Sequence, residues 1–235
     1  MALLAIETSG DLCSVALGIE NAVLERRITE PRGHNRLLLP AIDELLAESG
    51  YSLGRLDALV VGVGPGSFTG LRIGIGVAQG LAFGADLGVI PVSSLAALAQ
   101  AGVRTGVVAE AGLALPALDA RMGQMYWGLY RRRGALVDAL GEDRLDSPAA
   151  MAAAAGALLD KQVPAGLGGG WKAVSPDLPV RPVKPEVTAL ALDVLRLAEP
   201  LWTAGALVSP EQLEPRYLRG SDHWRRQGDG KGGRT

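Results

Sequence analysis

Cysteine, histidine and aromatic residues are all scarce in this sequence. The 235 residues include one cysteine, Cys13, and two histidines, His34 and His223, while aromatic side chains make up 4%. A single cysteine cannot form an internal disulfide, which is typical of a protein from a reducing compartment. Two histidines make a zinc or iron site of the usual two-histidine type hard to assemble, and no Cys/His cluster has zinc-ligand spacing. We therefore expect a cytoplasmic protein with a core of aliphatic and small side chains.

Long uninterrupted hydrophobic runs are also missing. The most apolar stretch, residues 58–92, is broken by Pro65 and Arg72 before it reaches the roughly 18 residues that indicate a membrane span. The opening residues lack the basic flank and long apolar core of a signal peptide, because Glu7 ends the first apolar run. We expect neither a membrane span nor export by that route.

Neither sign of charge dominates the chain. It has 23 Lys and Arg against 25 Asp and Glu, which gives a formal net charge of −2. This balance excludes a disordered polyelectrolyte and a strongly basic nucleic-acid binder. The arginines at 131–133 and at 219, 225 and 226 could meet RNA phosphates, but in an acidic chain scattered arginines more often form a solvated surface. Autonomous tight RNA binding is therefore not expected.

Glycine is abundant: 32 of 235 residues is about 14%, against a usual ~7%. In the first hundred residues, apolar runs alternate with turn residues and with helical periodicity, which predicts the order βββαβαβ and a further helix from residue 94 to about 101. The third strand ends in charged residues and is expected near a sheet edge. Expected strands cover 2–6, 13–19, 22–28, 56–63 and 89–92, and expected helices cover 35–49, with Asn35 as N-cap, and 71–84.

The second half of the chain gives a weaker signal. It predicts strands near 105–110, 113–119 and 125–131, an alanine-rich helix that follows Ser147 and Pro148 and runs to Asp160, and a helix over 186–199. The chain is therefore expected to be an α/β protein with an N-terminal lobe over 1–103, a smaller second lobe over 104–219, and a flexible basic tail over 220–235.

A polar turn between the first two expected strands is one candidate site. Residues 7–11 bring hydroxyls, free N–H groups and two carboxylates to a hairpin tip, which suits phosphate or a metal held through water. The same residue types are also what an ordinary tight turn demands. Residues 64–70 hold three glycines before a helix but lack the lysine of a P-loop, which favours a conformational role there. Both interpretations of the first turn stay open.

The expected helix at 71–85 is apolar almost all round. At about 100° per residue, Gly76, Gly80 and Gly84 form one stripe and aliphatic residues form another. A helix in a two-layer protein buries one face on its own sheet, so a second apolar face predicts another covering body. The helix at 36–49 repeats the pattern. A partner chain is favoured as the covering body, and packing of the two helices on each other and on the second lobe is the alternative.

Six short motifs stand in a fixed order along the chain. They are Ala5–Ser9 before an alternating strand, Arg32–Asn35 before an LLP-containing helix, GPGSFTGLRIGIGVAQGLA at 64–82, Pro91–Leu95, DARMGQMY at 119–126 and EPRYLR at 214–219. In this order they resemble the TsaB (YeaZ) family. The resemblance covers about residues 2–219, with GPGSFTGLR as its most specific part, while residues 138–182 match mainly by length and by the glycine-rich 166–170.

The resemblance implies an actin-like ATPase, ribonuclease H-like fold with two lobes of mixed sheets flanked by helices, in a bacterial cytoplasmic protein. It implies a part in placing threonylcarbamoyl on the adenosine that follows the tRNA anticodon. In that family the transfer from threonylcarbamoyl-adenylate belongs to a catalytic paralogue, TsaD, whose dimerisation partner is the TsaB-like chain, and an ATPase, TsaE, joins the assembly. The chain is therefore expected to be a non-catalytic accessory subunit that forms a homodimer when alone and meets tRNA indirectly, through the complex.

The resemblance implies no catalytic residue, no metal site and no cofactor of the chain's own, and it leaves ATP and Mg²⁺ only at the interface of the complex. The catalytic paralogue holds its metal with an HxxxH pair, whereas the stretch after Pro91–Ser94 contains no histidine here. Cys13 lies in an expected buried strand, where a thiol is usually inert. A peptidase, the historical label of the superfamily, lacks a convincing metal or nucleophile site in this sequence.

By the same analogy the helices at 36–49 and 71–85 form the interface. The expected interface residues are Leu38, Ile42, Leu45, Leu71, Arg72, Ile75, Gly76, Gln79, Gly80 and Phe83. The alternative function is a stand-alone actin-like nucleotide-binding protein or weak ATPase. Its vestigial site would place Thr8, Ser9 and Asp11 near the phosphates and the glycines at 168–170, Gly168 and Gly169 above all, near the base or ribose.

Overall fold

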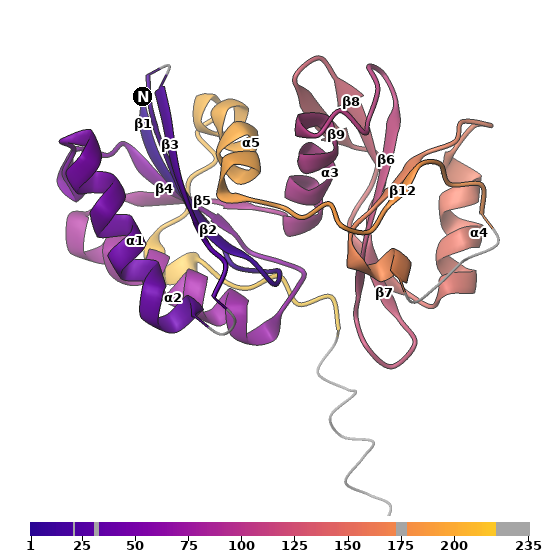
Figure 1. The fold of residues 1–235 in the computed structure, drawn as a ribbon, viewed down its shortest axis with the longest axis horizontal. Coiled ribbons are helices and arrows are strands. Elements are labelled where there is room, and N and C mark those ends of the chain that lie inside the picture. The colour runs from indigo at the N-terminus through magenta and orange to yellow at the C-terminus, as the bar shows by residue number, and fades with distance from the viewer. Residues whose placement is uncertain (21, 31–32, 173–177, 220–235) are drawn as a thin grey trace, which may run out of the picture.

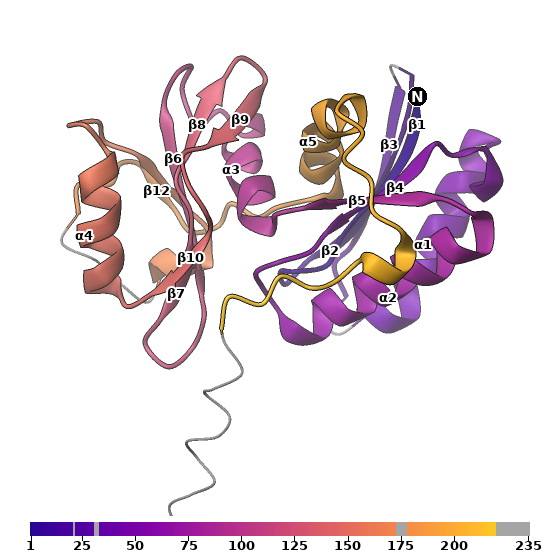
Figure 2. The same ribbon diagram turned by 180° about the vertical axis from the view of Figure 1, so that it is seen from behind.

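The computed structural model describes residues 1–20, 22–30, 33–172 and 178–219. Over this part of the chain, two lobes stand next to each other, each built around one β-sheet (Figure 1), and the view from behind shows the same division (Figure 2). The expected basic tail, 220–235, lies outside the described residues. None of the described helices is both long and apolar enough to cross a membrane.

The first lobe holds a five-stranded sheet in the order β3-β2-β1-β4-β5. Strand β2 pairs antiparallel with β1 and β3, whereas β4 runs parallel to both β1 and β5. The strands are Ala2–Glu7 (β1), Cys13–Ile19 (β2), Ala22–Ile28 (β3), Ala58–Gly62 (β4) and Gly88–Val92 (β5). The five strands expected from the sequence are confirmed, and so is the edge position of β3.

Helices cover both faces of the first sheet. Helices α1 (His34–Ser49) and α2 (Phe68–Ala85) pack on one face and α5 (Ala191–Thr203) packs on the other (Figure 1). Helix α3 (Ser94–Arg104) lies between α5 and the second sheet. Helix α5 thus belongs to the first sheet in space, although it falls within residues 104–219, the range expected to form the second lobe.

The alternation of side chains along the strands explains why both faces are covered. In β1, Leu4 and Ile6 join the hydrophobic cluster under α1 and α2, whereas Leu3 and Ala5 join the cluster formed with α3 and α5. Successive side chains of a strand point to opposite faces of the sheet, and all four residues are fully buried. A continuous apolar run such as Ala2–Ile6 is therefore a strand buried on both sides.

The second lobe is a seven-stranded sheet with the main order β10-β7-β6-β11-β12, in which β8 pairs with β6 and β9. Helix α3 packs on one face of this sheet and α4 on the other (Figure 1). The elements are Leu113–Asp119 (β6), Met125–Trp127 (β7), Tyr130–Arg133 (β8), Leu136–Ala139 (β9), Arg144–Asp146 (β10), Pro148–Leu158 (α4), Ala165–Leu167 (β11) and Val183–Lys184 (β12).

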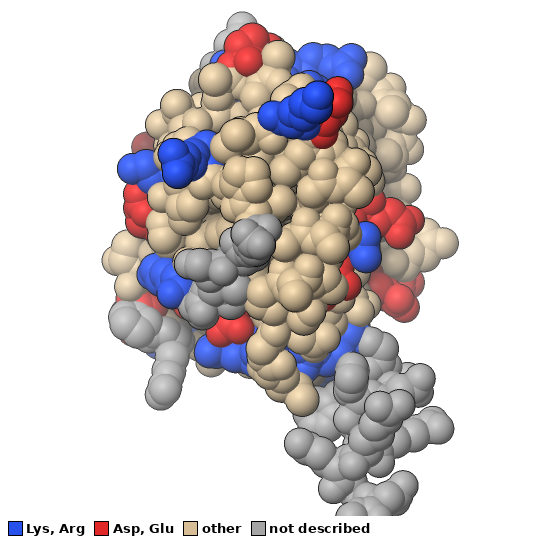
Figure 3. Space-filling view, turned by 90° about the vertical axis from the view of Figure 1, so that its right-hand side faces the viewer, with Lys and Arg blue, Asp and Glu red and all other residues tan. Residues whose placement is uncertain are grey.

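Helix α4 begins as the sequence predicts. The Ser147 hydroxyl accepts a hydrogen bond from the N–H of Ala150, and Pro148 occupies the first helical position. Met151 and Ala155 are buried against the sheet. Figure 3 shows the end of the molecule that carries α4, where uncharged side chains fill most of the middle and charged ones lie mainly toward the rim.

The prediction of a strand near residues 105–110 is wrong. Helix α3 continues to Arg104, three residues beyond the expected end, and the Thr105 hydroxyl donates to the carbonyl of Ala101. Gly106 then has φ of +72°, a left-handed conformation that favours glycine and ends the helix. The residues up to Glu110 form turns.

The strand expected over 125–131 is divided into β7 and β8. Between them, Gly128 lies against a buried carboxylate: a Cβ at this position would stand 2.7 Å from Oδ1 of Asp143 and 2.7 Å from the ring of Tyr130. The pairing of this segment with β6 is therefore interrupted at Gly128, next to the side chain of Asp143.

Several helix starts also differ from those expected. Helix α2 begins at Phe68 instead of residue 71, because the Ser67 hydroxyl accepts a hydrogen bond from the N–H of Gly70. The N-cap of α1 is Gly33 rather than Asn35. Helix α5 begins at Ala191 instead of residue 186, because the Asp193 carboxylate accepts from the N–H of Leu190 at 2.9 Å.

Candidate docking face and interlobe cleft

The outward side of α2 is an exposed ridge with few side chains. We call Arg72, Gly76, Gly80 and Phe83, which are all exposed, the α2 ridge. A Cβ placed on Gly76 or on Gly80 would meet nothing within 4 Å, while the Phe83 side chain is 74% exposed. The three- and four-residue spacings put these positions on one side of the helix. A bare helix backbone therefore lies open beside an uncovered aromatic ring.

Half of the expected interface residues lie in the core instead of on this ridge. None of them is more than 4% exposed: Leu38, Ile42, Leu45, Leu71 and Ile75. All five belong to the cluster between the first sheet and its two helices, because the face with the largest aliphatic side chains is the one that covers the sheet. The expectation that these five side chains form surface contacts is therefore corrected, because they pack inside the first lobe. Gln79 is half-buried.

The outer side of α1 is polar, contrary to the expectation that it repeats the pattern of α2. Arg26 of β3 pairs with Glu48 and lies 3.9 Å from Glu44, and Asp43 is also exposed. Leu39, 47% exposed, is the large apolar residue of α1 that faces solvent. Helix α1 is therefore an ordinary amphipathic helix, and of the two helices only α2 combines an exposed aromatic ring with bare glycine positions on its outer side.

A groove runs beside the α2 ridge. Its second wall is the segment Pro210–Arg219, here called the C-terminal strap. The Nε2 of Gln79 donates to the carbonyl oxygens of Pro210 and Leu213 at 3.1 and 3.0 Å. The groove has a volume of about 520 Å³ and is lined by Arg72, Ile75, Gly76, Gln79, Glu211, Leu213, Glu214, Pro215 and Tyr217.

The wall formed by the strap was not predicted as part of a site. Leu213 is 2% exposed and packs in the cluster under α2, and the Tyr217 ring lies 5.9 Å from that of Phe68. The Nε of Arg72 donates to the Tyr217 hydroxyl at 3.3 Å. The EPRYLR motif at 214–219 was the available signal in the sequence, but a motif alone does not say which element it packs on.

A cleft with a volume of about 800 Å³ lies between the lobes. Three of the five residues expected in a vestigial nucleotide site line it, namely Ser9, Asp11 and Gly169. The other two, Thr8 and Gly168, are buried beside the cleft and are not among its lining residues. Lys172 and Tyr126 contribute from the second lobe, and Thr188 contributes from residues 185–190, here called the crossing segment, which connect β12 to α5.

The polar turn after β1 is held tightly by the start of α2. The Thr8 hydroxyl donates to the carbonyl of Gly70 at 2.8 Å, and the N–H of Ser67 donates to the carbonyl of Ser9 at 2.7 Å. A Cβ on Gly70 would overlap the Thr8 carbonyl oxygen, and a Cβ on Gly74 its hydroxyl. Gly70 of the GPGSFTGLR motif and Gly74 just after it therefore allow the helix to pack directly on this turn.

At the base of this turn lies a buried carboxyl group. The Oε1 of Glu7 accepts from the N–H of Ser9 at 2.6 Å, and Oε2 accepts from the hydroxyl of Ser94 at 3.3 Å. Burial raises the pKa of Glu7, and the hydrogen bonds from Ser9 and Ser94 oppose this rise. The group is 1% exposed, so it shapes the floor beneath the cleft rather than contacting a solute directly.

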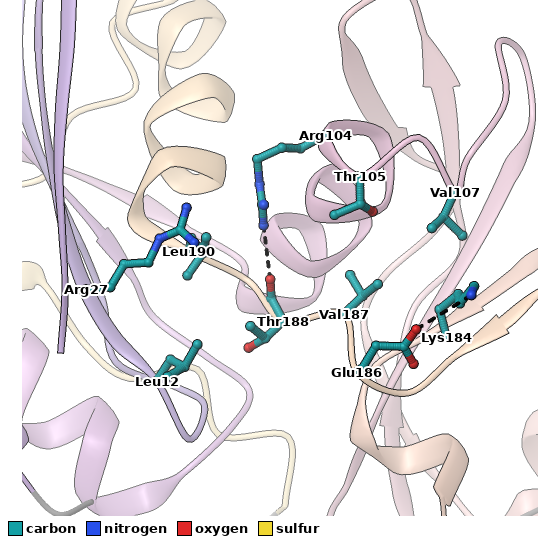
Figure 4. A pocket seen from close by; sticks show the side chains of 10 residues that line it. All are labelled: Leu12, Arg27, Arg104, Thr105, Val107, Lys184, Glu186, Val187, Thr188 and Leu190. Atoms are coloured by element: carbon teal, nitrogen blue, oxygen red, sulfur yellow. Dashed lines mark hydrogen bonds and ion pairs between the residues drawn. The ribbon is translucent and has the colours of Figure 1, made fainter. Parts of the chain in front are cut away.

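A smaller pocket of about 360 Å³ lies where the crossing segment meets α3 (Figure 4). Arg104 reaches from α3 to the carbonyl of Thr188, and Lys184 lies beside Glu186. Each cation of this pocket has an acidic partner within the chain: Arg27 pairs with Glu25 at 2.7 Å, Arg104 with Asp193 at 2.8 Å and Lys184 with Glu186 at 3.7 Å. These pairs neutralise the positive charge of the pocket, and the hydrogen bond from Arg104 to the carbonyl of Thr188 ties the crossing segment to α3.

Metal-ligating side chains do not gather in the described residues, where no three His, Cys, Asp or Glu residues are placed to hold a metal ion. The single thiol, Cys13, is buried, and burial raises its pKa to about 12. At neutral pH this thiol is protonated and therefore a poor nucleophile.

Comparison with known proteins agrees with the two-lobed geometry. The family model described as TsaD, tRNA N6-adenosine threonylcarbamoyltransferase, matches residues 24–177. The tRNA threonylcarbamoyladenosine biosynthesis proteins TsaB of Haemophilus influenzae and Escherichia coli are 37% and 38% identical over 232 residues, which cover 96% of this chain and 97% and 98% of theirs. The chain belongs to the TsaB (YeaZ) family. Its relatives by name act in tRNA threonylcarbamoyladenosine biosynthesis.

Solved structures support the same family. YeaZ from Pseudomonas aeruginosa has a TM-score of 0.83 and 40% identity, over 92% of this chain and 99% of that protein. A second structure, described as an uncharacterized protein with similarity to peptidase YeaZ from Pseudomonas aeruginosa, has a TM-score of 0.80 and 39% identity, over 93% and 99%. The α/β architecture with two mixed sheets flanked by helices confirms the actin-like, ribonuclease H-like fold that the TsaB resemblance implied.

Proposed function

We propose that this TsaB-family chain is a non-catalytic accessory subunit in threonylcarbamoyl transfer to the adenosine that follows the tRNA anticodon. In this proposal the chain works in the cytoplasm and docks through the α2 ridge on a TsaD-type catalytic paralogue. A peptidase activity is not part of the proposal, because the thiol of Cys13 is buried with a pKa of about 12.

The uncovered α2 ridge is the observation that carries the proposal. Exposed large apolar residues on a soluble surface mark interaction sites when they gather beside other apolar surface. Phe83, 74% exposed, stands on the same side of α2 as the bare positions Gly76 and Gly80. Glycines at a helix surface let a second helix approach more closely than the usual 8–10 Å between axes.

The match to the TsaD family model indicates which partner suits the ridge. Because residues 24–177, which include α2, match the model of the catalytic family, we infer an equivalent helix in a TsaD-type protein. Two copies of one fold pair most simply about a two-fold axis, and a paralogue can take the place of the second copy. We therefore propose a homodimer when the chain is alone and a heterodimer with the TsaD-type protein.

A simple pairing geometry follows from the helix itself. If two α2 helices cross antiparallel near Gly80, the Phe83 ring of each lies close to Gly76 of the other, where the groove beside the strap is open. The same crossing brings Arg72 of each helix toward Asp86 of the other. One helix thus carries both the protruding ring and the space that receives it.

The remaining partners follow from the family rather than from a site on this chain. A TsaE-type ATPase joins the assembly and supplies nucleotide chemistry there, with ATP and Mg²⁺ at the interface of the complex. Transfer RNA meets the chain through the complex, in keeping with its balanced charge.

Light scattering coupled to size-exclusion chromatography tests the docking. We expect a dimer when the chain is alone and a one-to-one complex after mixing with the TsaD-type protein of the same organism. If the chain remains a monomer in both samples, the docking proposal is wrong.

The interlobe cleft carries a second candidate function, namely nucleotide binding. Ser9, Asp11 and Gly169 line its 800 Å³, and Lys172 offers a positive charge. Against this interpretation, the Thr8 hydroxyl, expected near the phosphates, is already bonded to Gly70.

ATP with Mg²⁺ at millimolar concentration is expected to leave the melting temperature of the isolated chain unchanged, because the turn is occupied by α2. A ligand that binds only the folded state raises the melting temperature by mass action, so differential scanning fluorimetry is a direct test. A rise that Asp11→Ala removes, and that the matched exposed variant Asp86→Ala keeps, would establish nucleotide binding instead.

A further inference from the structure

The C-terminal strap is fixed to the first lobe along most of its length. Just before it, Val208 forms an antiparallel bridge with Val89 at the free edge of β5. Leu213 is buried under α2, and the N–H of Arg216 donates to the carbonyl of Val63 at 2.8 Å. These contacts place the strap as one wall of the groove beside the α2 ridge.

The side chain of Arg216 leaves the first lobe and reaches the second. Its Nη1 lies 3.1 Å from Oδ2 of Asp143, which sits between β9 and β10 with a side chain 3% exposed. The same carboxylate accepts from the Ser93 hydroxyl at 2.6 Å and from the Tyr130 hydroxyl. A buried carboxylate needs such donors, because water no longer solvates its charge.

The donors to Asp143 come from three different parts of the fold. Ser93 is the N-cap of α3, and its oxygen accepts from the N–H groups of Leu95 and Ala96. Tyr130 lies on β8, and burial together with the charge of Asp143 raises its pKa, so it stays a protonated donor. The carboxylate thus joins the start of the interlobe helix, the second sheet and the strap.

The end of the strap makes a second contact with the same lobe. The Nη2 of Arg219 donates to the carbonyl of Ala120 at 2.9 Å and to Oε1 of Gln124 at 2.8 Å. Ala120 and Gln124 belong to the turn between β6 and β7, in which Ala120 and Arg121 border the interlobe cleft. The strap therefore spans from the groove beside α2 to the rim of the cleft.

We propose that the C-terminal strap is a latch that couples the position of the second lobe to the groove beside α2, with the Arg216–Asp143 ion pair as its fastening. A displacement of the second lobe pulls on Arg216 and Arg219 and moves the wall of the groove. Because such a coupling is a free energy shared by both ends, a change at the groove also acts on the turn at the cleft.

Amide hydrogen exchange measured by NMR tests the latch without any docking partner. Asp143→Asn removes the charge from the fastening and is expected to speed exchange of the Arg216 N–H, which is bonded within the first lobe, at least about tenfold. Arg216→Gln removes the other half of the pair, whose side chain is 42% exposed, and is expected to speed exchange of the Leu213 N–H similarly. This second variant carries the test if Asp143→Asn does not fold.

A variant of α2 tests the coupling in the opposite direction, from the groove to the second lobe. Gln79→Ala removes both hydrogen bonds to the strap and is expected to speed exchange of the Ala120 N–H, which donates to the carbonyl of Gln124 in the second lobe. The matched control is Asp138→Asn on β9, which breaks an exposed ion pair with Arg133 of β8 and is expected to change none of these rates. Unchanged strap amides in Asp143→Asn and Arg216→Gln, or an unchanged Ala120 amide in Gln79→Ala, would overturn the latch.

Discussion

Gly80→Leu is expected to weaken association of the chain with its docking partner at least ~100-fold, since a side chain at the centre of a close helix crossing removes the central contact of the interface. The position is open in the isolated chain, where a Cβ meets nothing within 4 Å. Analytical ultracentrifugation over a concentration series, with the chain alone and with the TsaD-type protein, measures the loss.

Stability separates this effect from misfolding. Leucine has a higher helix propensity than glycine, so the same variant is expected to raise the free energy of unfolding by up to about 1 kcal/mol. Gly156→Leu on α4 is the matched control, because this exposed helical glycine lies on the second lobe. Association that survives in Gly80→Leu, or that falls equally in Gly156→Leu, would contradict docking through the α2 ridge.

Gly70→Ala is expected to lower the free energy of unfolding by about 2 kcal/mol or more, the range for overpacking a rigid contact. The added methyl group would overlap the carbonyl oxygen of Thr8, which is backbone and cannot rotate away. Relief requires α2 to lift from the turn after β1, and this would also strain the hydrogen bond from the Thr8 hydroxyl to the Gly70 carbonyl. Urea denaturation measures the change.

The same substitution in the middle of the same helix has the opposite expected sign. Gly76→Ala adds a methyl group where no atom lies within 4 Å and is expected to raise the free energy of unfolding by about 0.5–1 kcal/mol, through helix propensity alone. Equal effects at the two positions would show that α2 does not seat on Thr8 as described.

The strands of the first lobe were predictable because their signals are local. The apolar run at Ala2–Ile6, the alternation from Cys13 to Ile19 and the charged end of the third strand each depend on neighbouring residues, and the structure gives β1, β2 and β3 close to those bounds. Ser147 and Pro148 fixed the start of α4 in the same way.

Elements whose ends depend on distant contacts were not predictable. Helix α5 starts late because Asp193 binds the N–H of Leu190 and pairs with Arg104, 89 residues away. The strand expected over 125–131 is divided at Gly128, which lies against the side chain of Asp143. Arg216 of the strap binds the same carboxylate across 73 residues of sequence. The capping contact between Asp193 and Leu190 is local, but the contacts of Asp193 with Arg104 and of Asp143 with Gly128 and the strap leave no pattern in the local sequence.

The candidate interface shows a different limit of prediction from the sequence. Helical spacing groups Leu38, Ile42 and Leu45 on one face, but spacing alone does not say whether that face meets the sheet of the same chain or a partner. Burial decides the question, since these residues are at most 1% exposed. Periodicity placed Gly76, Gly80 and Gly84 in one stripe of α2, and the structure shows that these glycines lie on the exposed side together with Phe83.

Reconstituted threonylcarbamoyl transfer to tRNA is the measurement that tests the accessory role most directly. The reaction contains the TsaD-type protein, the TsaE-type ATPase and the enzyme that makes threonylcarbamoyl-adenylate, with wild-type chain, with Gly80→Leu, with Gly156→Leu or without the chain. We expect modification with wild-type chain and Gly156→Leu, and little or none with Gly80→Leu or without the chain. Equal modification in all four reactions would contradict the accessory role.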